Sequence, residues 1–403
     1  MAPLRIAYIT NHRRFKIHFR AYPWAQALAA RGHTVDVFCH ADTARWRTQV
    51  EQADGFRIVH NPDLLIGPLR QGWDPYCALR RYRFLAHEAQ PYDLIHCLDT
   101  RLAVIWPALA YARPRGIPVF SDWIDWWGRG GLIAERRPRW YQLMFGGIET
   151  WFEEHYRPQL DGLTAISQAL IERAVALGVP RDSCLHLPGG ANLAAFQDLP
   201  AREDARAALG LPPDAEVLCF SGLDVLIDLP LAIDAFAHIA RQRPRAWLLL
   251  VGPTPEAARR LAPDDATRAR IHATGPVPYA ALGRHLAAAD CFLMPYADKV
   301  SNVGRWPNKV GDYMCVGRPT ISNPVGEVAR LFEAHPIGVL TPPAPEAMAA
   351  AAQALLNDSA RRMQMGQAAR ATAEAHYAWD VLIDRLEAWY HARLAARLPR
   401  TAG

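Results

Sequence analysis

Residues 291–322 read CFLMPYADKVSNVGRWPNKVGDYMCVGRPTIS, and this stretch decides how the chain is expected to fold. It opens and closes with short apolar runs of strand length, Cys291 to Met294 and Thr320 to Ser322. A polar loop and a segment of helical periodicity lie between them. A strand, a helix and a second strand in this order predict two parallel strands joined by a crossover helix.

The same alternation runs from the first residues to about residue 340 and predicts an α/β fold. In the first half, we expect strands at residues 4–9, 34–38, 56–59, 94–97, 118–121, 162–165 and 184–187, and a helix at 21–31 that ends before Gly32. In the second half, we expect strands at 217–222, 247–251, 271–273, 291–294, 320–322 and 337–340. Beyond Pro343 the pattern is helical only.

The chain is expected to form two domains, because 403 residues exceed the size of an ordinary single core. The composition changes in a Pro- and Gly-containing stretch from Pro188 to Pro213, before the strand and helix alternation restarts. We predict two doubly wound, Rossmann-like domains facing a cleft, residues 1–195 and 196–375, followed by a C-terminal helix over 376–403. Ligands of such sheets bind at the carboxyl ends of the strands. No GxGxxG follows the first strand, which disfavours a dinucleotide cofactor.

Composition and charge exclude several other classes of protein. About half of the residues are hydrophobic (51%) and 21% are charged, as in ordinary globular proteins. The net charge of +5 is spread along the chain and gives little support for a nucleic-acid partner. The seven cysteines are widely spaced, with no CxxC pair, so we expect buried free thiols and no structural metal site.

The first ten residues lack the pattern of a signal peptide, and no stretch is long and apolar enough to span a bilayer. We therefore expect a cytoplasmic protein. The basic aromatic stretch from Arg136 to Phe145 would suit an anionic membrane surface, which leaves peripheral contact at the inner face of the membrane open. The alternative is that this stretch is an ordinary amphipathic helix.

The loop before the helix of the opening segment has the features of an anion site. Pro307 suits the first helical position, so the amides of Asn308, Lys309 and Val310 would be unpaired donors at the positive end of the helix dipole. Arg305 and Lys309 would flank a diphosphate held there without a metal ion. Preorganised donors of this kind stabilise the negative charge that grows on a departing phosphate.

Two neighbours extend this predicted diphosphate site. Gly304 would give the loop flexibility, and Asp312, three residues after Lys309 on the helix, would accept hydrogen bonds from ribose hydroxyls. The alternative is a group of solvated charges with an internal ion pair. The chain has lysine only at positions 16, 299 and 309, so two of its three lysines fall in this one segment.

Residues 121–131, SDWIDWWGRGG, follow a predicted strand of the first domain and have the composition of a carbohydrate site. The indoles of Trp123 and Trp126 would stack on sugar rings. Asp122 or Asp125 would orient an acceptor hydroxyl or stabilise positive charge at the sugar carbon. The alternative is that these indoles belong to the core and that the aspartates cap a helix.

Taken together, these motifs resemble the retaining glycosyltransferases of family 4, which have the GT-B fold, over nearly the whole chain. The matching pieces are FSG at 220–222, LLLVG at 248–252, TGPV at 274–277, ADCFLMPY at 289–296 and NKVGDYMCVGRP at 308–319. The segment from His376 resembles the helix that crosses back onto the first domain in that fold.

The resemblance implies that the turn from Gly275 to Val277 meets the nucleotide base, that Gly222 and Gly304 meet the diphosphate and that Asp312 meets the ribose. With the loop residues, the predicted donor site comprises Gly222, Gly275, Val277, Asn302, Gly304, Arg305, Lys309 and Asp312. The chain departs from the family twice. The first of the two glutamates common in the family falls at Gly304, and the usual Arg and Lys after Gly222 are missing. We infer that Arg305 and Lys309 replace that pair.

The function implied by the resemblance is that of a hexosyltransferase. It would move a sugar from a nucleotide diphosphate sugar to a carbohydrate or glycolipid acceptor with retention of configuration, without a cofactor or metal. The candidate catalytic residues are Asp122, Arg305 and Lys309, and the candidate acceptor contacts are Asn11, Asp122, Trp123, Asp125 and Trp126. The alternatives are a nucleotide-sugar epimerase of the same architecture and a non-catalytic GT-B-fold binding partner.

Overall fold

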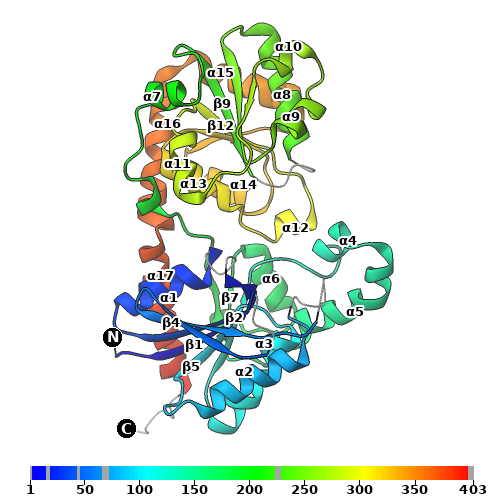
Figure 1. Ribbon diagram of the computed structural model, residues 1–403, viewed down its shortest axis with the longest axis vertical. Helices are drawn as coiled ribbons and strands as arrows, with labels where there is room; N and C mark the ends of the chain where they lie inside the picture. Colours follow the sequence, from blue (N-terminus) through cyan, green and yellow to red (C-terminus); the bar gives the residue numbers. More distant parts are fainter. Residues whose placement is uncertain (1, 15–18, 43–45, 66–71, 223–227, 398–403) are drawn as a thin grey trace. The chain divides into compact units, whose positions relative to one another are not determined.

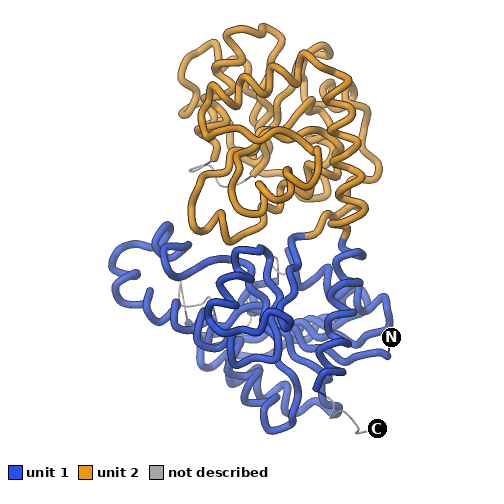
Figure 2. Tube along the Cα trace, turned by 180° about the vertical axis from the view of Figure 1, so that it is seen from behind, with its two compact units in different colours: residues 1–189, 379–403 blue, residues 190–378 orange. Residues whose placement is uncertain are grey.

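The computed structural model describes residues 2–14, 19–42, 46–65, 72–222 and 228–397, and the chain divides into two units (Figures 1 and 2). Unit 1 consists of Met1–Gly189 and Trp379–Gly403, and unit 2 consists of Gly190–Ala378. The change of unit comes a few residues before the predicted boundary at 195. The C-terminal segment belongs to unit 1 from Trp379 onward rather than from residue 376.

An eight-stranded sheet forms the centre of unit 1, in the order β3-β4-β2-β1-β5-β6-β7-β8. Its strands are β1 (Arg5–Arg13), β2 (Thr34–His40), β3 (Gln49–Ala53), β4 (Phe56–Asn61), β5 (Leu94–Cys97), β6 (Val119–Trp123), β7 (Gly162–Ala165) and β8 (Cys184–His186). Every pairing is parallel except that of the edge strand β3 with β4. The sequence did not predict β3, whose residues are mostly polar and lie at the sheet edge.

Seven α-helices accompany this sheet in the described part of unit 1. They are α1 (Ala21–Ala30), α2 (Pro75–His87), α3 (Leu102–Ala112), α4 (Leu132–Arg136), α5 (Arg139–His155), α6 (Gln168–Ala176) and α17 (Trp379–Arg397). Helix α1 ends at Ala30, one residue before the predicted end, and Gly32 follows with a φ of 90°. Helix α2 begins at Pro75, and the carboxylate of Asp74 accepts hydrogen bonds from the amides of Tyr76 and Cys77.

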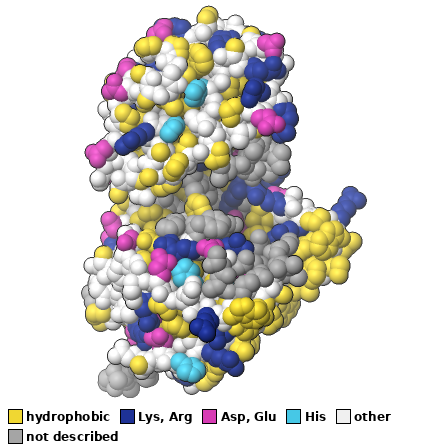
Figure 3. Space-filling model, in the orientation of Figure 1, with side chains coloured by type: hydrophobic (Ala, Val, Ile, Leu, Met, Phe, Trp, Pro, Cys, Tyr) yellow, Lys and Arg dark blue, Asp and Glu magenta, His cyan; other side chains and the backbone are white. Residues whose placement is uncertain are grey.

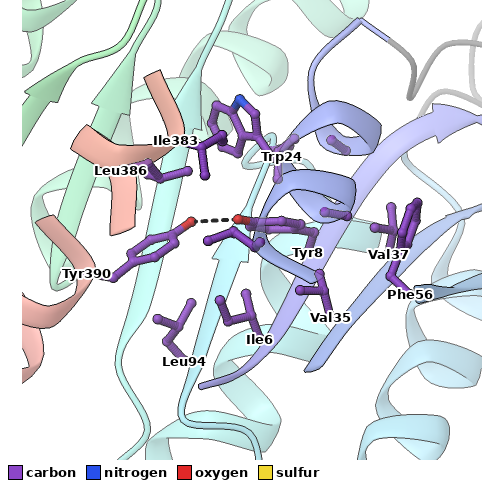
Figure 4. Close-up of a cluster of buried hydrophobic side chains, with 14 of the residues drawn as sticks. Ile6, Tyr8, Trp24, Val35, Val37, Phe56, Leu94, Ile383, Leu386 and Tyr390 are labelled. Carbon is purple, nitrogen blue, oxygen red and sulfur yellow. Dashed lines mark hydrogen bonds between the residues drawn. The ribbon is translucent and has the colours of Figure 1, made fainter. Parts of the chain in front are cut away.

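The last helix, α17, packs into the core of unit 1 (Figure 4). Its side chains Leu382, Ile383 and Leu386 are fully buried. The hydroxyl of Tyr390 lies 3.1 Å from that of Tyr8 and 2.6 Å from Nδ1 of His96. The predicted return of the C-terminal helix to the first domain is confirmed.

Unit 2 has a six-stranded sheet in the order β11-β10-β9-β12-β13-β14, with all pairings parallel. The strands are β9 (Glu216–Ser221), β10 (Ala246–Val251), β11 (Ile271–Ala273), β12 (Cys291–Met294), β13 (Thr320–Ser322) and β14 (Gly338–Leu340). The α-helices are α7 (Arg202–Ala208), α8 (Leu229–Gln242), α9 (Pro255–Leu261), α10 (Asp265–Arg268), α11 (Tyr279–Leu286), α12 (Val300–Val303), α13 (Asn308–Val316), α14 (Gly326–Ala334), α15 (Pro345–Asn357) and α16 (Ser359–Thr372). A π-helical turn over Ala373–Tyr377 follows α16.

Both sheets contain a topological switch point, the place at which the order of parallel strands reverses direction. In unit 2, β10 and β11 extend to one side of β9, and the chain then returns to add β12 on the other side. In unit 1 the corresponding point lies between β1 and β5. The predicted doubly wound α/β fold is confirmed, and such folds bind ligands at the carboxyl ends of the strands beside the switch point.

Candidate active site

Two glycines mark the carboxyl ends of β9 and β10 beside the switch point of unit 2. Gly222 follows β9 at φ 148°, and a Cβ there would lie 3.4 Å from Nζ of Lys309. Gly252 follows β10 at φ 111°, and a Cβ there would lie 2.5 Å from the carbonyl oxygen of Gly222. The positive φ favours glycine at both positions, and at Gly252 the nearby carbonyl oxygen also leaves no space for a side chain.

Lys309 reaches this strand end from the first turn of α13. Its Nζ lies 3.9 Å from Oδ2 of Asp228 and 4.3 Å from the centre of the Phe220 ring. The lysine side chain is about one fifth exposed (20%), and that of Asp228 is 7% exposed. The structure thus brings together Gly222 and Lys309, two residues of the predicted donor site. The Arg and Lys that are usual in the family after this glycine are missing from the sequence of this chain. Residues 223–227, which follow Gly222, lie outside the described residues.

The start of α13 differs from the prediction. The helix begins at Asn308, and Pro307 stands before it with φ −77° and ψ 106° instead of being its first residue. Because this extended ψ turns the Pro307 carbonyl toward the helix, it accepts a hydrogen bond from the amide of Val310 at 3.0 Å. The predicted availability of the Val310 amide to a ligand is therefore wrong.

Arg305 is held against Tyr296 rather than against Gly222. Its Nε donates to the Tyr296 hydroxyl at 3.3 Å, and its guanidinium lies 5.6 Å from the centre of that ring. The same hydroxyl donates to the carbonyl of Asn302 at 3.2 Å. The buried side chain of Asn302 donates to the carbonyl of Ala297 at 2.7 Å. Asn302 therefore holds the loop in shape, and its contact with a donor stays a prediction.

Gly304 directly follows the short helix α12, as its C-cap residue. Its amide donates to the carbonyl of Val300 at 3.1 Å, and its φ of −86° is one that any residue adopts. The observed backbone therefore gives no conformational reason for a glycine here, and the predicted contact of Gly304 with a diphosphate stays a prediction.

The turn after β11 lies beside the glycine that follows β10. The amide of Gly252 donates to the carbonyl of Gly275 at 3.0 Å, and the amide of Gly275 donates to the carbonyl of Pro253 at 3.0 Å. Val277, two residues further on, is half-buried. The structure thus places the predicted base-binding turn at the same edge of the sheet as Gly222.

Asp312, on α13, accepts a hydrogen bond from the hydroxyl of Tyr279 at 2.9 Å. Burial raises the pKa of Asp312 to about 7, an effect that the Tyr279 hydrogen bond partly opposes. The predicted role of this carboxylate is to accept hydrogen bonds from ribose hydroxyls, and only its ionised form accepts with both oxygens. Tyr279 was not among the predicted site residues.

We expect the KM for the nucleotide sugar to fall as the pH rises from about 6 to about 8, because the Asp312 carboxyl ionises around a pKa of about 7. Initial rates at several donor concentrations measure this. In Asp312→Asn the fall should disappear and KM should stay high. In Tyr279→Phe the midpoint should move to higher pH, since a hydrogen bond that lowers the pKa is lost. A wild-type KM that does not change with pH would contradict this role.

Unit 1 contains a small charged pocket near its own switch point. Carboxylates and arginines line it: Asp99, Asp122, Asp125, Glu149, Glu153, Arg101 and Arg157. Its volume of about 20 Å³ admits a water molecule and not a sugar ring. Burial lowers the pKa of Arg157 to about 10, and its Nε and Nη1 have no hydrogen-bond partner among the described residues.

Asp122 belongs to a buried ion pair at the end of β6. Both carboxylate oxygens accept from Arg20, at 2.5 and 2.8 Å, and the hydroxyl of Thr164 donates to Oδ1 at 2.5 Å. Arg20 and Asp122 are 5% and 1% exposed. These contacts occupy Asp122 with structural partners, so its predicted catalytic role stays a prediction.

Trp123 has the environment of a core residue, as the alternative interpretation of this segment expected. It is 1% exposed, and its Nε1 donates to Oε1 of Glu153 at 3.0 Å. The guanidinium groups of Arg157 and Arg173 lie 4.2 and 4.9 Å from its ring centre. Asp125 and Trp126 are half-buried and therefore more accessible to an acceptor.

Asn11 lies at the switch point of unit 1, where its Nδ2 donates to Oδ2 of Asp99 at 2.7 Å. Arg101 binds both Asp99, at 3.0 Å, and Glu149, at 3.1 Å. Sequence reasoning missed Asp99, Arg101 and Glu149. A signal existed in Glu149 and Glu153, which are four residues apart and therefore share one face of a helix.

One group in the described residues has the residue types of a metal site: His33, Glu387 and His391. Nδ1 of His33 accepts the amide of Leu4 at 3.0 Å, so the ring proton of the neutral imidazole lies on Nε2. That nitrogen is 3.1 Å from Oε1 of Glu387 and donates to it. These two hydrogen bonds hold the His33 ring beside Glu387.

The chain matches two glycosyltransferase family models and is similar to several named glycosyltransferases. A model described as "Glycosyl transferase 4-like domain" matches residues 17–190, and one described as "Glycosyl transferases group 1" matches residues 215–358. A D-inositol 3-phosphate glycosyltransferase from Kineococcus radiotolerans is 26% identical over 88% of this chain and 85% of its own length. A GDP-mannose-dependent alpha-(1-6)-phosphatidylinositol monomannoside mannosyltransferase from Mycobacterium tuberculosis is 28% identical over 59% of this chain and 63% of its own.

Solved structures of other proteins share the fold of this chain. The solved structure of sucrose-phosphate synthase from Thermosynechococcus elongatus superposes with a TM-score of 0.71 at 21% identity, covering 98% of this chain and 100% of that one. Two doubly wound sheets, parallel except for the edge strand β3, and the matched family models together define a glycosyltransferase with the GT-B fold. The chain belongs to glycosyltransferase family 4, as its sequence motifs indicated.

Proposed function

We propose that the chain transfers a hexose from a nucleoside diphosphate hexose to a carbohydrate or glycolipid acceptor, with retention of configuration and without a metal ion or cofactor. The observation that carries this proposal is the approach of Lys309 to the strand end at Gly222, where an added Cβ would lie 3.4 Å from the ammonium nitrogen. A cation beside a glycine backbone at a switch point suits a pyrophosphate.

The reaction needs this charge because the departing diphosphate gains negative charge while the sugar becomes oxocarbenium-like. Lys309 would stabilise the diphosphate in the transition state, and Arg305 would assist from the same loop. In a retaining transfer the leaving phosphate itself accepts the proton of the acceptor hydroxyl. The mechanism therefore requires no separate general base.

The donor site is tested by a thermal-shift panel of UDP, GDP and ADP with their monophosphates. One diphosphate at about a hundred times its Kd should add about 2.7 kcal/mol of stability. The matching monophosphate should add less, because it lacks the phosphate that Lys309 contacts. The matching nucleotide sugar then serves in transfer assays with and without EDTA. Loss of transfer in EDTA would contradict the metal-free mechanism, and NMR of the product's anomeric carbon tests retention.

Incubation of the nucleotide sugar without an acceptor separates the alternatives. A transferase should leave the donor intact or hydrolyse it slowly. An epimerase would convert the donor to a second nucleotide sugar, and a binding partner would bind the nucleotide without any turnover. Either of these last two results would overturn the proposal.

For the acceptor we propose a chemical class and no particular compound. The names of the two relatives specify an inositol phosphate and a phosphatidylinositol mannoside, which supports a carbohydrate or glycolipid acceptor here. We place the protein in the cytoplasm, with contact at the inner face of the membrane. Within the described part of the chain, no helix has the length and apolar character needed to cross a membrane.

A further inference from the structure

Helix α5 exposes one stripe of apolar side chains and buries two of its three glutamates. One face of the helix, with members three and four residues apart, consists of Trp140, Leu143, Met144, Gly147, Ile148 and Trp151. We call this set the α5 apolar face. Every member is exposed, with fractions that run from 47% at Trp151 to 87% at Leu143 among the side chains larger than glycine.

The opposite face of α5 fixes the orientation of the helix. Glu149 and Glu153 are each 4% exposed. Glu149 pairs with Arg101 at 3.1 Å and accepts from the hydroxyl of Tyr141. Glu153 accepts from the amide of Gly128 at 2.7 Å. Turning the helix to hide its apolar face would leave these carboxylates without partners, so the fold holds the apolar face outward.

Basic side chains border the α5 apolar face at its N-terminal end. Arg136 and Arg139 are exposed, and Arg137 is half-buried, 5.1 Å above the ring of Tyr141. Figure 3 shows hydrophobic side chains gathered over α4 and α5, with basic side chains at their edge. An exposed apolar patch of this kind, rimmed by charge, marks a surface that binds a partner.

We propose that the α5 apolar face, with Arg136 and Arg139, docks on the headgroup region of an anionic lipid bilayer. Tryptophan is the residue that favours the boundary between headgroups and acyl chains, and Trp140 and Trp151 stand at the two ends of the stripe. Leu143, Met144 and Ile148 lie between them and enter the acyl boundary. The arginines meet lipid phosphates. We choose an anionic lipid surface as the occupant because the exposed basic rim is complementary in charge to its headgroups.

The same helix connects the bilayer to the charged pocket of unit 1. Its buried carboxylates Glu149 and Glu153 line that pocket, while its other face contacts lipid. A glycolipid acceptor would then lie in the same bilayer to which the enzyme binds. This last step rests on the proposed transferase function, whereas the docking itself does not.

Sedimentation with vesicles of phosphatidylcholine, with and without phosphatidylglycerol, tests the docking. The wild-type chain should bind the anionic vesicles, and salt should weaken this binding. Leu143→Glu and Met144→Glu should each lower the partition coefficient by about tenfold, because a carboxylate replaces apolar surface at the acyl boundary. Arg136→Glu should lower binding to anionic vesicles by roughly fivefold or more, and change binding to neutral vesicles little.

Met363→Glu on α16 is the matched control, because Met363 is 62% exposed and Met144 is 65% exposed. It should bind vesicles as the wild type does. Equal vesicle binding by Leu143→Glu and wild type, or no binding by wild type, would overturn the proposal. So would a wild-type dimer that Leu143→Glu converts to a monomer in light scattering without any vesicle binding, since a protein contact would then occupy the face.

Nucleotide binding separates this inference from the proposed transferase function. Leu143→Glu should keep the thermal shift given by the matching nucleoside diphosphate, because α5 lies outside the donor residues of unit 2. A chain that docks on vesicles but binds no nucleoside diphosphate would refute the transferase and leave the docking intact. A chain that binds the nucleotide but no vesicle would refute the docking and leave the transferase function intact.

Discussion

Lys309→Ala is expected to lower kcat by about 10² to 10³, the loss typical of removing one preorganised donor from a developing oxyanion. The Lys309 ammonium lies 3.9 Å from Asp228 and beside the glycine that ends β9, so its charge is fixed before the donor binds. A charge that is already in position does not have to be reoriented during the reaction. The substitution should therefore lower mainly kcat. Steady-state kinetics with the matching nucleotide sugar measure it.

Lys299→Ala is the control for this variant, since Lys299 is the exposed lysine of the same loop. It removes the same charge ten residues earlier and should change kcat by less than about twofold, because an exposed charge interacts weakly through solvent. If Lys309→Ala left both turnover and donor affinity unaltered, Lys309 would have no part in the mechanism.

Asp122→Ala is expected to destabilise unit 1 by about 3 to 5 kcal/mol, the cost of removing one partner from a buried ion pair. The guanidinium of Arg20, 5% exposed, would lose both of its bonds to the carboxylate and stay charged in the interior. The hydroxyl of Thr164 would lose its acceptor as well. Denaturation in urea, followed by circular dichroism, measures the change.

Asp125→Ala provides the comparison, because Asp125 is a half-buried aspartate of the same segment. Its substitution should cost less than about 1 kcal/mol. The pair of variants also decides between the two interpretations of Asp122. A stable but inactive Asp122→Ala would support the predicted catalytic role and contradict the structural one.

The strands whose residues are all buried were predicted well. The expected bounds of β5, β7, β12 and β13 agree with the structure, and so do those of the half-buried edge strand β11. Strand β3 escaped prediction because it pairs at the sheet edge, where exposed polar residues such as Gln49 and Gln52 suffice. Its partner strand β4 supplies the hydrophobic side of the pairing, and a single sequence does not reveal such a partner.

Single residues of the candidate donor site could be predicted from the sequence, but the residues that they contact could not. Gly222, Lys309 and Asp312 stood out from glycine position, lysine scarcity and helix spacing. The partners Asp228 and Tyr279 did not, because their contacts depend on which strands become neighbours at the switch point. The pair of Arg20 and Asp122 was hidden for the same reason, with a separation of 102 residues along the chain.

Helix α5 shows a different limit of sequence reasoning. Its amphipathic pattern was visible, and an amphipathic helix ordinarily turns its apolar face inward. The structure has the reverse orientation because Glu149 and Glu153 meet buried partners in unit 1. Only those tertiary contacts identify which face is outside.

The path of the chain has a consequence for biosynthesis. Unit 1 is left at Gly189 and is completed only by Trp379–Gly403, whose Leu386 and Tyr390 fill its interior. During synthesis, residues 1–189 are therefore made long before residues 379–403, which complete the hydrophobic core of unit 1. All residues of unit 2 are made before unit 1 is complete, and a stop codon shortly before Trp379 would leave unit 1 without its last helix.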